Sequence, residues 1–382
     1  MKKEIFKNIN LKKSTIIKLL TLTILICIII TLVVLYKNND NVRKMFDKYV
    51  FMKHVQENNL PKIETDSKYI YAFKNNILVF KDNELKAYNK NEKEEYSLHL
   101  EISNPIFKVN GDYFCIAENG GKRIYVIANK NIIWQSEVNG NISDVSINKN
   151  GQVAITTLGT TDKSVVTVYN AKGEEQFSKH IADDLVLDVA LSEDNKNLAI
   201  AKVNYSGINV KCTIETIDIK EAREGKTVIN EYKSELGDLI INIHYTNKNA
   251  LVCMYDKYIA IIKDNTITKK VDFSLEEVLF ADINDKIIQV GKTKENTQNS
   301  KIEIKMLNIE TDKVKQLEIE EPKAIYVFGD IIAVNFGSEA IFINNNGWLI
   351  KEYTSSQEIK NIVISENIAG IIYKHKVEII SL

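Results

Sequence analysis

The sequence predicts an all-β fold, a β-propeller of eight four-stranded antiparallel blades preceded by one N-terminal transmembrane helix. Three observations predict it. Residues 19–36 contain no charged side chain and are apolar almost throughout. After Pro61, short β-branched runs bounded by turn residues recur in groups of four about every forty residues, until the chain ends. No Pro-, Gly- or Ser-rich linker interrupts them, and a closed repeat array accounts for one domain of this length.

The apolar segment is long enough to cross a bilayer. About 20 helical residues span the hydrocarbon core, and Ser14–Tyr36 supplies them when the Lys18 ammonium extends to the headgroups. A cleaved signal peptide is the alternative, but the apolar run is long for one and no small-residue cleavage site follows Tyr36. We therefore expect an uncleaved signal anchor at 19–36 in the cell membrane.

Orientation depends on length more than on charge, because lysines flank the anchor on both sides. A short basic segment is the easier one to retain in the cytoplasm, and long domains translocate largely regardless of their charge. We expect residues 1–18 to be cytoplasmic and the remainder of this single-pass protein to be extracytoplasmic.

Residues 37–60 form the predicted link between anchor and propeller. Val42, Met45, Phe46, Tyr49 and Val50 recur at helical spacing, which predicts a juxtamembrane helix with one apolar stripe. The stripe packs on the propeller or at the membrane interface in one interpretation. In the other, residues 42–50 form a homodimer seam.

The propeller domain is predicted to cover residues 61–382. Its units are aligned by the turn between their third and fourth strands, as in Ala128–Asn131 and Tyr169–Gly173, where Asn and Gly supply the positive φ angles of tight hairpins. By this alignment the eight units begin near residues 69, 103, 142, 186, 240, 277, 323 and 359. Seven blades are the alternative, in which the weak first unit merges with the last.

Closure of the ring provides an independent argument. The last unit offers three strands, within 359–365, 368–373 and 377–382, and then the chain ends. The segment Pro61–Asp66 is available as the fourth. Pairing of the two ends would close the ring and secure both termini.

Several motifs are similar to those of known propellers. Ser192–Ala199, reading SEDNKNLA, resembles the hairpin of WD40-like and TolB-like propellers. Asn131–Trp134 and Asn346–Trp348 resemble the G-x-x-W of quinoprotein-type repeats, imperfectly. The layout, with Asn104–Ala128 introducing the second blade, is similar to an uncharacterised family of membrane-anchored propellers from low-GC Gram-positive bacteria. The resemblance implies fold and topology only, since that family has no assigned activity.

No motif specifies a reaction or a cofactor. The five histidines are scattered over separate units without metal-ligand spacing, and Asp183, Asp184 and Asp188 are interpreted as a solvated turn. Cys115, Cys212 and Cys253 fall in apolar strand runs, which favours buried thiols; a disulfide between two of them stays open. The formal net charge of −1 does not indicate a nucleic-acid partner.

The longer insertions lie mostly between the second and third strands of the units, and these B–C loops should share one face of the ring with the D–A links. Clustered insertions often mark the binding face of a repeat protein. The candidate residues are Glu118, Asn119, Lys122, Arg123, Thr160, Asp162, Lys163, Asn204, Tyr205, Lys292, Lys294 and Glu295. We expect a non-enzymatic scaffold that binds a protein or an envelope polymer; an enzyme or ligand sensor using the central channel is the alternative.

Overall fold

The computed structural model describes residues 13–39, 42, 45–47, 50–51, 53–57, 60–159, 161–226, 229–235, 237–273, 277–293 and 301–382. Contacts divide the chain into two compact units, residues 1–55 and 56–382. The first contains the helix α1 (Lys13–Asn38), and the second contains eight β-sheets.

Helix α1 is apolar on every side. Its large hydrophobic side chains between Leu19 and Leu35 are all exposed to the surroundings. Within the described residues, Lys18–Asn38 is the one helix long and apolar enough to cross a membrane, a test that a signal sequence also passes. A helix without a polar face has no stable place in water, so this segment requires an apolar environment.

The described residues that follow α1 make several polar and aromatic contacts with Tyr36 near its end. Tyr36 Oη donates a hydrogen bond to Asp47 Oδ1 at 2.7 Å, and Lys53 Nζ lies 2.7 Å from the same oxygen. The Tyr36 ring also contacts Phe46 and Phe51 edge-on. Val42, Met45 and Phe46 of the predicted juxtamembrane stripe are helical. Tyr49 lies outside the described residues, so the stripe itself stays a prediction.

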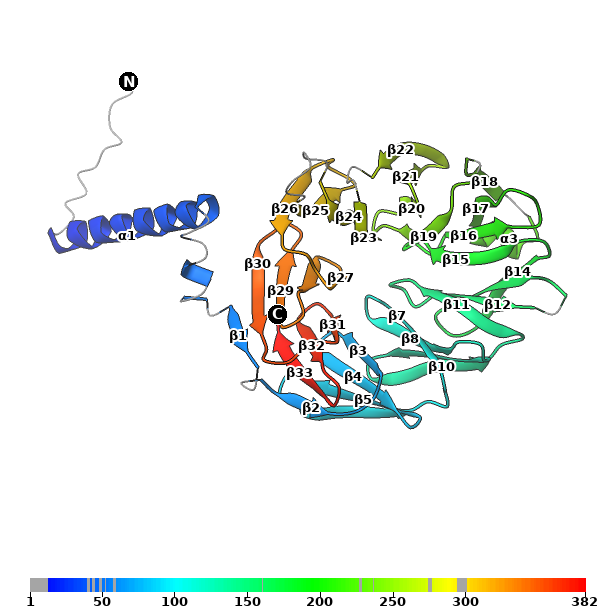
Figure 1. Ribbon diagram of the computed structural model, residues 1–382, viewed down its shortest axis with the longest axis horizontal. Helices are drawn as coiled ribbons and strands as arrows, with labels where there is room; N and C mark the ends of the chain where they lie inside the picture. The colour runs from blue at the N-terminus through cyan, green and yellow to red at the C-terminus, as the bar shows by residue number, and fades with distance from the viewer. Residues whose placement is uncertain are drawn as a thin grey trace, which may run out of the picture. The chain divides into compact units, whose positions relative to one another are not determined.

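The second unit is an eight-bladed propeller of antiparallel sheets, which confirms the predicted fold class (Figure 1). Blades 1 to 4 comprise β3 (Tyr69–Phe73), β4 (Asn76–Lys81), β5 (Glu84–Asn89), β6 (Glu94–His99); β7 (Pro105–Asn110), β8 (Tyr113–Glu118), β9 (Arg123–Ala128), β10 (Asn131–Glu137); β11 (Asn141–Ile147), β12 (Val153–Leu158), β13 (Ser164–Tyr169), β14 (Glu175–Ile181); and β15 (Leu185–Leu191), β16 (Asn197–Asn204), β17 (Lys211–Asp218), β18 (Ile229–Lys233).

Blades 5 to 8 follow the same order. They comprise β19 (Ile240–Tyr245), β20 (Leu251–Tyr255), β21 (Tyr258–Lys263), β22 (Thr266–Asp272); β23 (Glu277–Ile283), β24 (Lys286–Lys292), β25 (Ile302–Asn308), β26 (Val314–Ile319); β27 (Ala324–Phe328), β28 (Ile331–Asn335), β29 (Glu339–Asn344), β30 (Leu349–Thr354); and β31 (Asn361–Ile364), β32 (Ile368–Ile372), β33 (Lys376–Ser381) with β2 (Lys62–Glu64). The short strand β1 (His54–Gln56) precedes Glu57. Each blade begins within two residues of its predicted start.

The first strand of every blade faces the centre of the ring, and the fourth lies on the outer side; in blade 7 it is followed by a fifth strand, β1 (Figure 1). The second strand is sandwiched between neighbouring blades, and β20 and β28 are buried along their whole length. Seven apolar clusters fill spaces between adjacent blades; one joins Phe73 and Phe80 of blade 1 to Phe114 of blade 2. Truncating a buried Ile to Ala in such a cluster costs about 2–5 kcal/mol.

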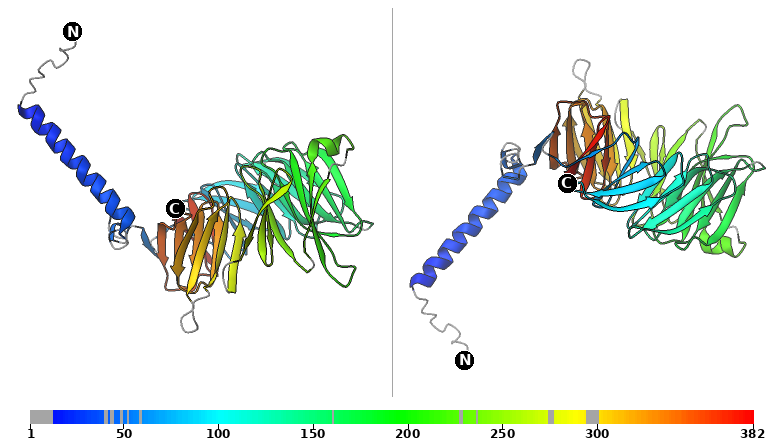
Figure 2. Two further views of the ribbon diagram at one scale, coloured as in Figure 1. Left: turned by 90° about the horizontal axis from the view of Figure 1, so that it is seen from above. Right: turned by 90° about the horizontal axis from the view of Figure 1, so that it is seen from below.

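The strand ends behave as predicted, with one exception. The two-residue C–D turn of blade 2 has Asn129 at φ 50° and Lys130 at φ 66°, the positive values that tight hairpins require. The exception is the long C–D connection of blade 4, which begins with the helix α3 (Ile219–Arg223), capped by the Asp218 carboxylate on Glu221 N. Figure 2 shows α3, the short green helix, at one face of the ring.

The two ends of the propeller close the ring, as the sequence predicts. In the last sheet β2 pairs antiparallel with β33, with Ile63 opposite Val377. The main chain of Ile379 also donates to Pro61 O at 2.9 Å, and Ile63 is buried. Blade 8 therefore takes its outer strand from the N-terminal side of the domain, and no blade is missing a strand.

Candidate functional site

The B–C loops and the D–A links share one face, and hydrogen bonds join them. In blade 2, Gly120 N donates to Ile142 O at 2.8 Å, and Ile142 N donates to Gly121 O at 2.7 Å. Asn119 N likewise donates to Asn104 O. On the opposite face, Ile219 N at the start of α3 donates to Lys196 O of an A–B turn. We call the first of these surfaces the loop face.

Several candidate residues of the loop face have partners in their own or a neighbouring connection. Glu118 is the last residue of β8, and its carboxylate accepts a hydrogen bond from Ser103 Oγ at 2.8 Å. Arg123 is the first residue of β9 and forms ion pairs with Glu101 and Glu137. The main-chain carbonyl of Lys122 accepts from Val138 N. These groups hold blade 2 to its links.

Blades 3 and 4 repeat this arrangement. Asp162 Oδ2 lies 2.8 Å from His180 Nδ1, and Lys163 Nζ donates to Asp183 O while lying 4.6 Å from the Tyr205 ring centroid. Two further candidates are paired: Asn204 donates to Asp184, and Lys292 donates to Glu277. Thr160, Lys294 and Glu295 lie outside the described residues. Part of the polar groups in the predicted loops therefore forms hydrogen bonds and ion pairs within the propeller.

The loop face instead exposes apolar side chains. Twelve large hydrophobic residues of the described part of the propeller are exposed, and eight of them lie on this face over blades 3 to 6. The eight are Leu158, Leu187, Tyr205, Ile208, Leu239, Ile241, Val278 and Leu279. We call them the apolar patch. The other four are Ile133, Ile267 and Val314 on outer strands and Trp348 beside a C–D turn.

A repeated irregularity produces much of the apolar patch. The first strands of blades 3, 4, 5 and 6 each shift register against their neighbour at the same point. The extra residue is Ser143 in β11, Leu187 in β15, Ile241 in β19 and Leu279 in β23. A β-bulge of this kind re-aims side chains and is typical of functional rims. Here three of the four extra residues are exposed and apolar.

Polar side chains from adjacent blades meet in the central channel. Lys108 on β7 lies with its Nζ 3.6 Å from Asp144 Oδ1 on β11. Asp188 on β15 accepts a hydrogen bond from the main-chain N–H of Ile243 on β19 at 2.7 Å. A pocket of about 190 Å³ is lined by the first strands of these four blades and includes Lys108, Asp188 and His244. The interpretation of Asp188 as part of a solvated turn is therefore wrong, because it lies inside β15.

Burial perturbs the acids and bases of the channel. Burial, reinforced by the neighbouring Asp144 carboxylate, raises the pKa of Asp188 to about 7. Burial alone would lower the pKa of Lys108, but Asp144 and Asp188 outweigh it and raise that pKa. Burial lowers the pKa of His244 and raises that of Asp282, on β23, to about 6.

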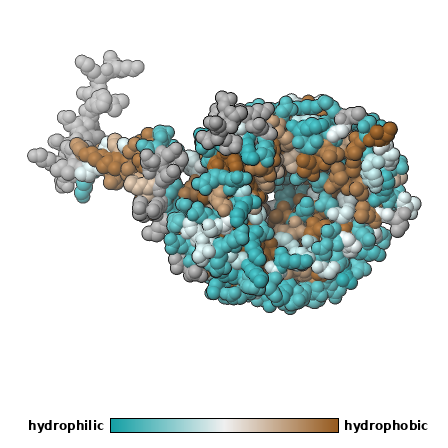
Figure 3. All heavy atoms as spheres, viewed as in Figure 1, coloured by the Kyte–Doolittle hydropathy of each residue, from teal (hydrophilic) through white to brown (hydrophobic). Residues whose placement is uncertain are grey.

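The other half of the channel is apolar. A second pocket, of about 370 Å³, is lined by first strands of blades 1, 2, 6, 7 and 8, and Val109 lines both pockets. Its walls include Tyr71, stacked on Phe107 with ring centroids 4.3 Å apart, and Phe280 and Tyr326. Figure 3 shows a hollow at the centre of the ring with hydrophobic residues along part of its rim. The channel is thus polar on one side and aromatic on the other.

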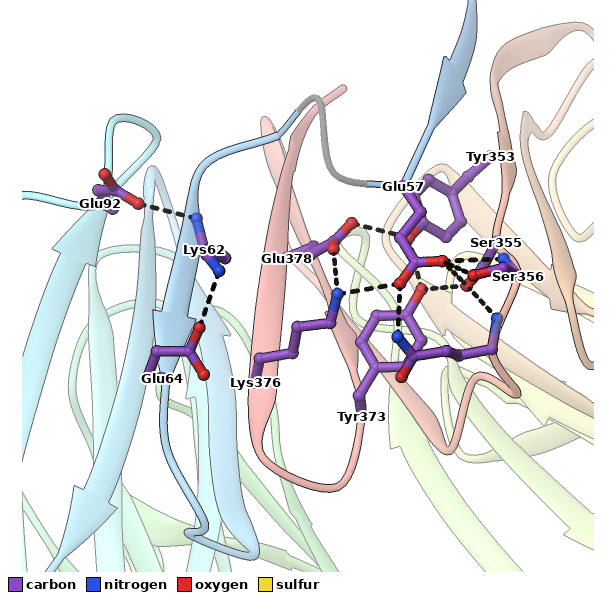
Figure 4. Close-up of polar contacts among 11 residues, drawn as sticks. Glu57, Lys62, Glu64, Glu92, Tyr353, Ser355, Ser356, Tyr373, Lys376 and Glu378 are labelled. Carbon is purple, nitrogen blue, oxygen red and sulfur yellow. Dashed lines mark hydrogen bonds and ion pairs between the residues drawn. The ribbon is translucent and has the colours of Figure 1, made fainter.

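Another cluster of polar side chains lies where the ring closes (Figure 4). The buried carboxylate of Glu57 accepts hydrogen bonds from the hydroxyls of Ser355 and Ser356 and from Gln357 Nε2, and it pairs with Lys376. Lys376 also pairs with the fully buried Glu378, whose other oxygen accepts from Tyr353 Oη. These contacts join the segment before β2 to blades 7 and 8, so their role is structural.

Cysteines and metal ligands do not form a site in the described part of the chain. All four cysteines are free, and Cys115, Cys212 and Cys253 are buried. The disulfide that the sequence left open is not formed. In the same residues no group of three His, Cys, Asp or Glu side chains is arranged to hold a metal ion.

Sequence reasoning missed the channel residues because no local signal marks them. Lys108, Asp144, Asp188 and Asp282 lie in four different repeats and meet only when the ring closes. One usable signal is a charged residue inside an apolar first strand, such as Asp188 in LVLDVAL or Asp282 in EVLFADI. First strands of a propeller line the channel, so such residues are the ones to examine.

Residues 43–382 match a family of unknown function, DUF5711. The chain belongs to this family. The match covers the whole propeller. No curated protein matches the sequence.

Several solved structures are similar to this DUF5711 protein at low sequence identity. BamB from Moraxella catarrhalis is 11% identical, with 85% of this chain and 99% of that chain covered and a TM-score of 0.49. Hydrazine synthase of Kuenenia stuttgartiensis is 11% identical, with coverages of 86% and 99% and a TM-score of 0.45. The Pan2 WD40 domain of Neurospora crassa is 11% identical, with 72% of this chain and 88% of that chain covered and a TM-score of 0.47. Similarity at this level carries no information on activity.

Proposed function

We propose that this protein is a single-pass membrane protein that presents its propeller outside the cytoplasm and binds a protein partner through the apolar patch. The observation that carries the proposal is the concentration of eight of the twelve exposed large hydrophobic residues on one face of four adjacent blades. Contiguous exposed apolar surface is uncommon on soluble domains and marks interaction sites. The non-enzymatic scaffold expected from the sequence thus has a defined surface.

A protein partner fits this surface better than an envelope polymer. Interfaces between proteins have an apolar centre surrounded by a polar rim. Here Leu187 and Ile241 supply an apolar centre, and paired groups such as Lys163 with Asp183 and Lys292 with Glu277 lie on the same face. A hydrophilic polymer would favour exposed hydrogen-bonding groups, and many of the predicted ones already have partners within the propeller.

The location rests on α1 and on the short basic segment before it. An exposed helix that is apolar on every side supports membrane insertion. The basic residues before it are proposed to stay in the cytoplasm, with residues 37–60 linking the anchor to an extracytoplasmic propeller. Homodimerisation through residues 42–50 remains a proposal; in that segment Met45 and Val50 are exposed.

Site-specific photocrosslinking in the native membrane tests the docking surface. A photoreactive residue at Leu187 should yield one defined adduct, and the substitution Ile241→Asp in the same chain should abolish it. The matched control places the photoreactive residue at Ile133, on an outer strand, and should yield none. Equal yields at Leu187 and Ile133, or an adduct that survives Ile241→Asp, would show that the patch is not the docking surface. An adduct with glycan instead of protein would assign the surface to an envelope polymer.

A second function is proposed for the channel, that of an extracytoplasmic ligand sensor. The convergence of Lys108, Asp144 and Asp188 beside an aromatic pocket supports it, because small-molecule sites are concave, mostly apolar and supplied with few polar groups. A propeller channel filled only by Val, Ile and Ala would have opposed it. Catalysis is not part of this proposal; the test is the ligand titration described below.

A further inference from the structure

The channel contains one polar and one aromatic pocket, and we refer to the two together as the cavity. They meet at Val109, which lines both, and together they involve first strands of all eight blades. The aromatic pocket, about 370 Å³, lies within the range of roughly 300–1,000 Å³ that small-molecule sites occupy. A ligand that fills both pockets therefore has an apolar body and one polar end.

The cavity has more acidic than basic side chains, which disfavours an anionic ligand. Asp188 and Lys108 line the polar pocket and Asp282 lines the aromatic one, and Lys108 Nζ is already 3.6 Å from Asp144 Oδ1. Glu193 also lines the polar pocket, but its two oxygens accept from Asn110 Nδ2 and Lys149 N. Burial lowers the pKa of His244. Among the described residues the cavity therefore has an excess of negative charge when its acids are ionised.

Two further observations indicate what would compensate this charge. Oδ2 of Asp144 is buried and has no hydrogen-bond partner among the described residues. Asp282 lies in the aromatic pocket, and the hydrogen bond that opposes the effect of its burial comes from the main chain at Ile283. A carboxylate next to aromatic rings is the combination that binds an ammonium group, because the ring faces carry negative potential.

We propose that the channel binds a small organic cation, an amine or quaternary ammonium on an apolar or aromatic body. The ammonium lies between Asp282 and the polar pocket, and the body packs against Tyr71, Phe107, Phe280 and Tyr326. The inference rests on the proposed sensing function of the channel and specifies its ligand class. It is independent of the apolar patch, which lies on the loop face outside the channel.

Calorimetric titration of the full chain in detergent micelles tests the ligand class. The probes are 2-phenylethylammonium, 2-phenylethanol and phenylacetate, which share one aromatic body and differ in charge. We expect saturable binding of the ammonium and at least about tenfold weaker binding of the other two, as expected for loss of one charged hydrogen bond. Titration at pH 6.5 in buffers of different ionisation enthalpy should also reveal proton release, since a bound cation favours ionised Asp188 and Asp282.

The outcomes distinguish an error in the proposed ligand class from an error in the proposed sensing function. Preferential binding of phenylacetate or phenylethanol would overturn the cation assignment and leave a sensing function in place. Absence of saturable binding for all three probes would overturn both. Asp282→Asn should weaken ammonium binding about tenfold or more, and Asp183→Asn, at an exposed carboxylate of a D–A link, should not. Near-ultraviolet circular dichroism establishes that each variant is folded; unchanged binding by a folded Asp282→Asn protein would contradict the proposed site.

Discussion

The Nζ atom of Lys376 lies 3.0 Å from Oε1 of Glu57, although the two residues are 319 positions apart. The Glu57 side chain is buried and that of Lys376 is 14% exposed, and Glu57 also accepts from Ser355, Ser356 and Gln357. This contact forms only when the last blade meets the first residues of the domain. Closure of the ring is therefore secured by a largely buried ion pair as well as by the pairing of β2 with β33.

Acid should weaken this closure. The hydrogen bonds to Glu57, first that from Ser356 Oγ, lower its pKa from 4.5 to about 2, although burial opposes them. A lowered pKa contributes stability that is complete above about pH 4.5 and is lost as the pH falls towards 2. That contribution is on the order of 3 kcal/mol. Urea unfolding between pH 2 and 6 should show a steeper loss for the natural protein than for Glu57→Gln. Parallel curves would contradict the role of Glu57.

Removal of the closing strand should destabilise the propeller. Deletion of residues 60–68 removes β2, exposes Val377 and Ile379 and leaves β33 as an unpaired edge. We expect the melting temperature of the purified domain to fall by roughly 5–10 °C, the shift that a loss of a few kcal/mol produces. The control is the domain that begins at residue 56 and retains β2. An equal melting temperature for the two proteins would refute the closure.

The channel acids should give stability the opposite dependence on pH. Because the pKa of Asp188 is raised from 3.8 to about 7, the folded state binds a proton more tightly than the unfolded state, and stability falls as the pH rises between these values. Asp188→Asn removes the titration, so the decline in the urea midpoint between pH 4 and 8 should become shallower. Asp183→Asn, outside the channel, should leave the slope unchanged. An identical decline in Asp188→Asn would show that Asp188 does not titrate in this range.

Substitution of two glycines by alanine should distinguish the cost of backbone strain from the cost of a steric clash. Gly120 and Gly173 have φ angles of +75° and +80°, but a Cβ atom at Gly120 meets open space whereas one at Gly173 would lie 2.8 Å from Trp134 Cδ2. Gly120→Ala should cost about 1–2 kcal/mol for its backbone alone. Gly173→Ala should cost a further 1–3 kcal/mol or so from the displaced indole. Equal urea midpoints for the two variants would show that Trp134 moves aside freely.

Cysteine accessibility tests the proposed orientation. Burial raises the pKa values of the Cys115 and Cys253 thiols and makes them unreactive. An added thiol at the exposed C–D turn of blade 1, Asn91→Cys, should therefore dominate labelling. A membrane-impermeant maleimide should modify it in intact cells, while a thiol at Lys3→Cys reacts only after permeabilisation. The reverse pattern would place the propeller in the cytoplasm.

The sequence predicted the fold closely because the signals for a propeller are local. Alternating strands and Asn- or Gly-containing turns identify each blade, and the incomplete last unit identifies the closing segment around Lys62–Glu64. The candidate site was less predictable. Glu118 and Asp162 have the composition of a binding loop, yet Ser103 and His180 occupy their carboxylates. Which polar groups are already paired depends on contacts between links that the sequence does not encode locally.

The bulges were unpredictable for a related reason. Leu187, the extra residue of β15, is neither a glycine nor an asparagine, so nothing in the sequence indicates a break in the ladder. In a regular strand Val186 and Asp188 would lie on the same face, whereas the bulge pairs them with the consecutive residues Lys202 and Ala201, so Asp188 and every later side chain change face. The channel position of Asp188 and the exposure of Leu187 thus both follow from one inserted residue.

The use of an N-terminal strand to complete blade 8 has a consequence for biosynthesis. Lys62–Glu64 leaves the ribosome before the rest of the propeller, but its partner Lys376–Glu378 is made only after all the intervening blades. At roughly 5–20 residues per second, synthesis of the intervening chain takes about 15–60 s. Throughout this interval β2 has no native partner and stays exposed to incorrect pairing. A chain truncated before β33 would leave a permanently open ring, which quality-control proteases could recognise.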